Sequence, residues 1–308
     1  MNFLKKWYTY QKERFPVIKY GIYIFAIVFA TFFYNVYIGP AVQIFIHKVT
    51  FNNAVNPYLF EVNYMKLIPM FCVAFLQFFM VRIIDEFKDY EEDCKYRPYR
   101  PVPRGLIKLN ELKIVFIICA ILQLFITLFN SRFLGIIYLG FLWIFFAIMS
   151  KSFFMKKILD KHILIEVFLD ELMMPILVIY LSSFVYYANI IFLWPILLIS
   201  YIISWIVEVA RKIRCKEDEE KGVKTYTAVF GIKGAVGILF ILQLILFILH
   251  TIILGKERIL ISLTLFSIAS IVNILFAIKQ NRKFAKLTEL VANIYIFIVY
   301  FSMILLVL

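Results

Sequence analysis

The chain has 308 residues, of which 63% are hydrophobic and 17% are charged. This composition is too apolar for a soluble fold of this length and indicates a polytopic membrane protein. The formal net charge of +13 would suggest nucleic acid as a partner of a soluble protein, but basic residues gather in the cytoplasmic loops of membrane proteins. We therefore expect no nucleic-acid binding.

Apolar runs long enough to cross a bilayer recur along the chain. Residues 1–16 are basic and aromatic, and they predict a cytoplasmic segment lying on the membrane surface. The runs that follow predict nine transmembrane helices, near residues 17–39, 64–84, 112–130, 133–150, 163–187, 190–210, 235–254, 259–278 and 290–308. The sequence thus predicts an all-α, single-domain membrane protein over residues 1–308.

The distribution of basic residues predicts the orientation of these helices. The loops that nine spans place on one side hold 28 of the 33 Lys and Arg residues, and the loops on the other side hold five. Since basic loops stay in the cytoplasm, we expect a plasma (inner) membrane protein with a cytoplasmic N-terminus and an outer C-terminus. Motif-bearing cytoplasmic loops are expected at residues 85–110 and 211–234.

Cysteine and histidine point to no metal or haem site. No two of the four cysteines form a C-x-x-C pair, so neither disulfides nor zinc is indicated. The three histidines are scattered along the chain and make no metal constellation, and we expect no haem.

Residues 85–105, DEFKDYEEDCKYRPYRPVPRG, concentrate charge at the end of the second apolar run. Asp85, Asp89 and Asp93 recur every four residues and would share one face if the helix continued. Like charges at that spacing repel, and Mg²⁺ typically binds between such carboxylates and the phosphates of a substrate. A stiff, proline-rich loop follows, with basic side chains suited to phosphate oxygens. The alternative is an ordinary solvated loop.

A second acidic cluster follows the sixth apolar run, in residues 208–231, EVARKIRCKEDEEKGVKTYTAVFG. The two clusters together hold 11 of the 20 acidic residues. Both follow spans that end on the same side of the membrane, so they can face each other across a cavity. For Glu208 the alternative is an ion pair within its own helix, with Arg211 and Lys212.

The order Asp-Glu-x-x-Asp-x-x-x-Asp, followed by Arg-Pro-x-Pro-Arg-Gly, resembles the first aspartate-rich motif of the UbiA superfamily of intramembrane prenyltransferases. That motif usually begins Asn-Asp, where this chain has Asp85 and Glu86. Asp218-x-x-x-Gly, then Val-Lys-Thr-Tyr and a later glycine, is similar to the second motif. Arg214 stands where that motif usually has an aspartate, which puts two full metal sites in doubt.

The resemblance implies nine helices around a central cavity and Mg²⁺-dependent transfer of a prenyl group from a prenyl diphosphate within the membrane. We expect the acceptor to be lipophilic and aromatic, although the resemblance does not identify it. The expected catalytic residues are Asp85, Asp89, Asp93 and Asp218. The expected metal ligands are Asp85, Glu86, Asp89, Asp93, Glu208, Glu217 and Asp218. The expected diphosphate ligands are Arg97, Arg100, Arg104, Lys151, Arg211, Lys212, Arg214, Lys224 and Tyr226.

Asp170 and Glu171 lie inside the fifth apolar run, where a carboxylate costs roughly 2.5–3.5 kcal/mol on insertion scales. Something must compensate this cost. One possibility is a basic residue of a neighbouring helix, and the other is a role in binding the acceptor or taking its proton.

Three other functions remain open. A terpene cyclase of the same superfamily would ionise the same diphosphate without an acceptor. A non-catalytic carrier of isoprenoid lipids is favoured by Arg214. A CDP-alcohol phosphotransferase is disfavoured, because its Asp-Gly-x-x-Ala-Arg run is missing from the sequence.

Overall fold

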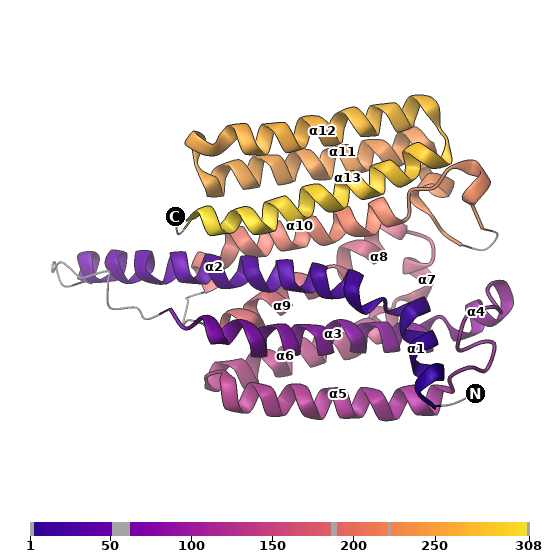
Figure 1. Ribbon diagram of the computed structural model, residues 1–308, viewed down its shortest axis with the longest axis horizontal. Coiled ribbons are helices and arrows are strands. Elements are labelled where there is room, and N and C mark those ends of the chain that lie inside the picture. Colours follow the sequence, from indigo (N-terminus) through magenta and orange to yellow (C-terminus); the bar gives the residue numbers. More distant parts are fainter. Residues whose placement is uncertain (1–2, 51–61, 186–189, 221–222, 307–308) are drawn as a thin grey trace.

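The computed structural model describes residues 3–50, 62–185, 190–220 and 223–306, with residues 37–50 and 190–191 described by their backbone alone. Every regular element in these ranges is a helix. The helices that could cross a membrane lie side by side along the long axis of the molecule (Figure 1).

Eight helical segments are long and apolar enough to cross a membrane. They are built on α2 (Val17–Thr50), α3 (Leu67–Lys88), α5 (Leu109–Asn130), α6 (Phe133–Ser150), α10 (Trp194–Arg211), α11 (Tyr226–Leu254), α12 (Ile259–Lys279) and α13 (Arg282–Phe301). The fifth predicted span is instead two shorter helices, α8 (Ile163–Asp170) and α9 (Met173–Ser182). The prediction of an all-α polytopic membrane protein is confirmed.

The break between α8 and α9 has a local cause. Pro175 lies in the first turn of α9, where its missing N–H is tolerated. A continuous helix would bring its ring against the carbonyl of Glu171, four residues earlier, and would lose that hydrogen bond. Glu171 and Leu172 therefore form a turn, which places two adjacent carboxyl groups, Asp170 and Glu171, at the junction.

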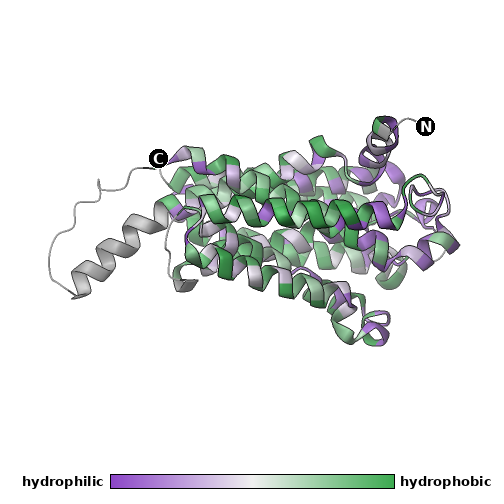
Figure 2. Cartoon of the chain, turned by 90° about the horizontal axis from the view of Figure 1, so that it is seen from below, coloured by the Kyte–Doolittle hydropathy of each residue, from purple (hydrophilic) through white to green (hydrophobic). Residues whose placement is uncertain are grey.

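Hydrophilic residues gather at one end of the bundle, as Figure 2 shows. We call it the charged end; it comprises α1 (Phe3–Arg14), α4 (Tyr90–Tyr96), α7 (Lys156–Leu159) and the loop residues 97–107, 212–220 and 223–225. The N-terminal residues are more than a surface segment, because α1 packs on the loop that follows α4. Tyr10 of α1 is fully buried there with Val102, Ile107 and Ile83.

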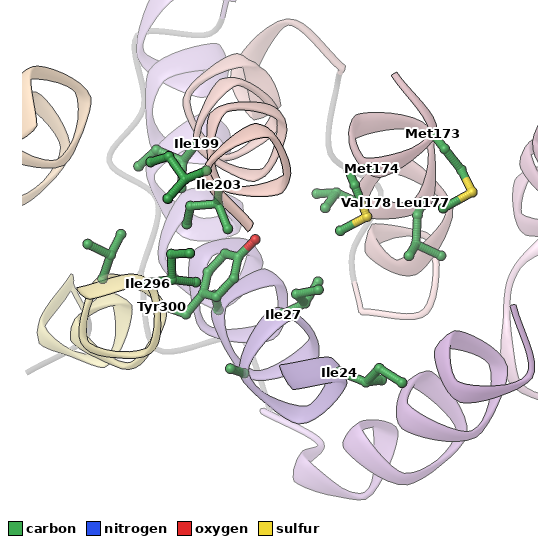
Figure 3. Close-up of a cluster of buried hydrophobic side chains, with 14 of the residues drawn as sticks. Ile24, Ile27, Met173, Met174, Leu177, Val178, Ile199, Ile203, Ile296 and Tyr300 are labelled. Carbon is green, nitrogen blue, oxygen red and sulfur yellow. The ribbon is translucent and has the colours of Figure 1, made fainter. Parts of the chain in front are cut away.

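The interior of the bundle is apolar. Side chains of α2, α9, α10 and α13 turn towards one another, among them Ile27, Met174, Ile203 and Tyr300 (Figure 3). Helix α10 contacts α9, α11 and α13, and so lies between the first helices and the last ones.

Interhelical hydrogen bonds fix the first helices relative to one another. Buried Gln123 of α5 donates to Gln77 Oε1 of α3 over 3.2 Å and accepts from Trp143 Nε1 of α6 over 2.9 Å. Lipid provides no hydrophobic force between helices, so bonds of this kind help to set how each helix is rotated.

The last helices carry a separate set of such bonds. Asn273 of α12 donates to Gln243 of α11 over 2.7 Å. Buried His250 lies between the hydroxyls of Ser262 and Ser302, at 2.8 and 2.7 Å. Every ring nitrogen of this histidine thus has a partner.

Candidate functional site

The first acidic motif is divided by a break at Asp89. Helix α3 ends at Lys88, Asp89 adopts φ −96° and ψ 3°, and α4 begins at Tyr90. The expected single helical face is therefore interrupted. Glu86 and Asp93 turn into the protein, with side chains 1% and 2% exposed, whereas the Asp85 side chain is 39% exposed.

Arginines neutralise the two buried carboxylates. Arg14 of α1 lies 2.5 Å from Glu86 and 3.8 Å from Asp93. Arg82 is 3.1 Å from Glu86, while Arg97 and Arg100 are 3.3 and 2.5 Å from Asp93. We call these four arginines with Glu86 and Asp93 the arginine network. A buried carboxylate held this way has its charge already compensated, and these arginines are engaged as well.

Asp89 lacks such compensation. It makes no ion pair with any residue that the structure describes. Burial, together with the charges of Asp85 and Asp93, raises the pKa of Asp89 to about 6. A carboxyl group that resists ionisation for these reasons favours a nearby cation.

The first motif faces α10. Glu208 forms the ion pairs expected within its own helix, with Arg211 at 2.5 Å and Lys212 at 2.6 Å. Asp85 interacts electrostatically with both Glu208 and Arg211. The start of the second acidic segment therefore meets the first motif at the charged end.

The carboxyl groups at the α8–α9 break join the same group. Asp170 lies 3.8 Å from Lys88 of α3, and Glu171 interacts with Glu208 and Arg211. The compensation expected from a neighbouring helix is thus supplied in part by Lys88. One Asp170 oxygen, Oδ1, is buried without a hydrogen-bond partner.

Tyr226 adds a hydroxyl from α11. Its side chain is fully buried, its oxygen has no hydrogen-bond partner, and it interacts electrostatically with Glu208 and Glu171. Thr225 caps α11 by accepting from the backbone of Ala228, and this cap places Tyr226 in the first turn.

We call this group the polar site. It consists of Asp85, Lys88, Asp89, Glu166, Asp170, Glu171, Glu208, Arg211, Lys212 and Tyr226. Lys88, Glu166, Arg14 and Arg82 were missed from the sequence. Two features of the sequence could have indicated Glu166 and Lys88 as site residues. Glu166 and Asp170 are four residues apart, and Lys88 lies inside the first motif.

The other residues of the second motif are not part of the polar site. Asp218 lies 3.3 Å from Arg282 of α13, and Arg214 pairs with Glu220 at 3.2 Å. Glu217 is exposed and makes no ion pair among the described residues. Further on, α11 kinks at Gly231, whose φ of +69° suits glycine.

Six of the nine expected diphosphate ligands lie outside the polar site. Arg97 and Arg100 belong to the arginine network, Arg214 pairs with Glu220, and three others remain. Arg104 pairs with Glu13 of α1 at 2.8 Å. Lys224 donates to the carbonyl of Asp160 over 2.6 Å. Lys151 is exposed at the end of α6 and forms no ion pair with a described residue.

The donor set of the polar site fits a hard divalent cation. Asp85, Asp89 and Asp170 offer only oxygen atoms, and Asp170 Oδ1 lacks a partner. Among the described residues, no three His, Cys, Asp or Glu side chains gather closely enough to hold a metal by themselves. A Mg²⁺ ion held by these carboxylates would therefore also need oxygen ligands from a substrate.

The model of the UbiA prenyltransferase family matches residues 58–301. The chain belongs to this family. The match spans both acidic motifs and every helix of the polar site. A search of curated proteins gives no match.

Solved UbiA structures share the fold. One, described as giving insights into digeranylgeranylglyceryl phosphate synthase in membranes, is 21% identical, with a TM-score of 0.59 over 97% of this chain and 98% of that one. The apo UbiA homologue from Aeropyrum pernix K1 is 13% identical, with a TM-score of 0.59 over 88% and 94%. The UbiA homologue from Archaeoglobus fulgidus bound to DMAPP and Mg²⁺ is 13% identical, with a TM-score of 0.51 over 90% and 96%.

The arginine network yields a stability prediction. Replacing Arg14 by Met removes the hydrogen bond to buried Glu86 and should lower the free energy of unfolding by about 1.5–3 kcal/mol. The matched change Arg104→Met breaks a half-exposed pair with Glu13 and should cost less than about 1 kcal/mol. Thermal unfolding in detergent compares the two, and equal losses would contradict a structural role for the network.

Proposed function

We propose that this protein catalyses Mg²⁺-dependent transfer of a prenyl group from a prenyl diphosphate to a lipophilic, aromatic acceptor within the membrane. The observation that carries this proposal is the continuity between the polar site and the apolar interior. Glu171 precedes Met173 and Met174 by two and three residues, and both methionines lie among the apolar side chains of Figure 3. A charged head group and an apolar chain can therefore lie next to each other.

In this proposal the two accessible aspartates, Asp85 and Asp89, hold Mg²⁺. Glu86 and Asp93 keep the break at Asp89 in place through the arginine network, which makes their contribution indirect. Asp218 and Glu217 stay as further candidates, and Asp218 would have to leave Arg282 first. Because Arg211, Lys212 and Tyr226 belong to the polar site, they are the best placed of the expected diphosphate ligands.

The transfer breaks the bond between C1 of the prenyl chain and the diphosphate oxygen, and the electron pair leaves with the diphosphate. Mg²⁺ supplies charge stabilisation of that leaving group. The donors of Arg211, Lys212 and Tyr226 stabilise the same charge. C1 then bonds to the acceptor, which gives up a proton. Asp170 or Glu171 is the group proposed to bind the acceptor and take this proton, while the apolar helices exclude water.

The comparisons support the donor class. A UbiA homologue has been solved with DMAPP, a prenyl diphosphate, and Mg²⁺. The lipophilic acceptor is proposed from the apolar interior next to the polar site rather than from these structures, since their identities to this chain are low.

We further propose that the charged end faces the cytoplasm, which places the N-terminus inside and the C-terminus outside. The support is the concentration of Lys and Arg at this end.

Substitution of the proposed metal ligands tests this function. Asp85→Asn and Asp89→Asn should each lower Mg²⁺-dependent release of pyrophosphate by at least about 100-fold, because each removes a charge that holds the cation. The matched control is Glu91→Gln, since Glu91 is exposed on α4 and makes no ion pair among the described residues. Thermal unfolding should be unchanged in all three variants. Full turnover by Asp89→Asn would refute the assignment.

The choice between transferase, cyclase and carrier can be made with the wild-type protein. Purified protein in lipid nanodiscs is incubated with Mg²⁺, a series of prenyl diphosphates and a membrane lipid extract. A transferase should release pyrophosphate and form a prenylated lipid only when the extract is present. A cyclised hydrocarbon formed without the extract would favour the cyclase. Donor binding without release of pyrophosphate would favour the carrier.

Cys94 offers a test of orientation, because it is exposed at the charged end whereas Cys119 and Cys215 are buried. A membrane-impermeant maleimide should label the protein weakly in intact cells and strongly after the cells are opened. Replacing Cys94 by Ser should abolish the increase. Strong labelling of Cys94 in intact cells would reverse the orientation.

A further inference from the structure

Lys88 lies between carboxyl groups of two helices. Its Nζ is 3.8 Å from Asp170 Oδ2 and 3.9 Å from Glu166 Oε1, both on α8. It also interacts electrostatically with Asp85 and Asp89 of the first motif. One ammonium group therefore faces four carboxyl groups, and it cannot neutralise them all.

The Lys88 ammonium forms no short ion pair with Glu166 or Asp170. Separations of 3.8 and 3.9 Å are longer than an N–H···O hydrogen bond. By contrast, Arg211 and Lys212 are held by Glu208 at 2.5 and 2.6 Å. Lys88 can thus turn its three donors to an incoming anion without breaking a short ion pair.

A buried hydroxyl at the same place points to a ligand. Tyr226 is fully buried, and its oxygen lacks a hydrogen-bond partner although it interacts with Glu208 and Arg211. A buried donor with no partner in the protein costs free energy, and a bound oxyanion would satisfy it. The oxyanion would then lie among the positive groups of the polar site.

The second motif offers few carboxylates for a second metal. Asp218 pairs with Arg282, and Arg214 carries a positive charge beside it. With Asp218 and Glu220 paired in this way, positive side chains can supply part of the charge that a second divalent ion would bring.

We propose that Lys88 binds the diphosphate directly and takes the place of a second Mg²⁺, so that this chain holds its diphosphate with one metal ion. The proposal rests on the proposed function of the polar site. On binding, Lys88 turns from Glu166 and Asp170 to the diphosphate oxygens, and this leaves Asp170 free to face the cation.

Binding of inorganic pyrophosphate to the full-length protein tests the role of Lys88. At saturating Mg²⁺, titration calorimetry should show Lys88→Met binding pyrophosphate about 10- to 100-fold more weakly than wild type, because a charged hydrogen bond is lost. Lys88→Arg keeps the charge and should stay within about threefold. Lys113→Met, an exposed lysine on α5, is the matched control and should bind like wild type.

Mn²⁺ in place of Mg²⁺ gives a second measurement that needs no variant. Electron paramagnetic resonance of the wild-type pyrophosphate complex should count one bound Mn²⁺ per chain. Two bound ions would overturn the proposal, and so would unchanged pyrophosphate binding by a folded Lys88→Met protein. In those cases Asp89→Asn would still lose pyrophosphate binding if the proposed function holds. Failure of the wild type to bind pyrophosphate at all would instead reject the proposed function itself.

Discussion

Charge next to an apolar bundle has to be compensated, and this requirement organises the charged end. In a region of low dielectric constant an uncompensated carboxylate is costly, so each one needs a cation or a strong donor. The arginine network meets the requirement within the protein: Glu86 and Asp93 each contact arginine at 2.5 Å. The polar site does not, because Asp89 has no ion pair among the described residues and Lys88 faces four carboxyl groups. The arginine network thus compensates its buried carboxylates with charges of the protein, whereas the polar site is suited to a ligand.

The broken fifth span links this charge to the apolar interior. Since α8 ends at Asp170 and α9 begins at Met173, the carboxyl groups face the first motif while the next turn of α9 already packs in the core. Met174 and Leu177 lie in the cluster of Figure 3. Pro175, which accounts for the break, therefore helps to place Asp170 and Glu171 at the junction.

Much of the fold could be predicted from the sequence, because a span of about twenty apolar residues is dictated by bilayer thickness. The two acidic segments were also recognisable, and the expected pairing of Glu208 with Arg211 and Lys212 is present. The partners of the individual carboxylates were not predictable. The sequence suggests one set of carboxylates in the first motif, formed by Asp85, Glu86, Asp89 and Asp93. In the structure the non-helical residue Asp89 divides this set. Arg14 reaches Glu86 over 72 positions of sequence, and a contact of that kind depends on tertiary packing. Lys88 was not predicted as a site residue, because its neighbours in the sequence are acidic and the motif was interpreted from them.

Among the interhelical hydrogen bonds are two sets that share no helix. Gln77, Gln123 and Trp143 join α3, α5 and α6, whereas Gln243, Asn273 and His250 belong to α11 and α12. The first set is complete once residue 150 has been synthesised, before α10 exists. A chain emerging from the ribosome folds its early segments first. The protein can therefore insert into the membrane in two stages, and in each stage interhelical hydrogen bonds align the helices. The polar site draws on α3, α8, α10 and α11, so it is complete only after α11 has been synthesised and has packed on α10.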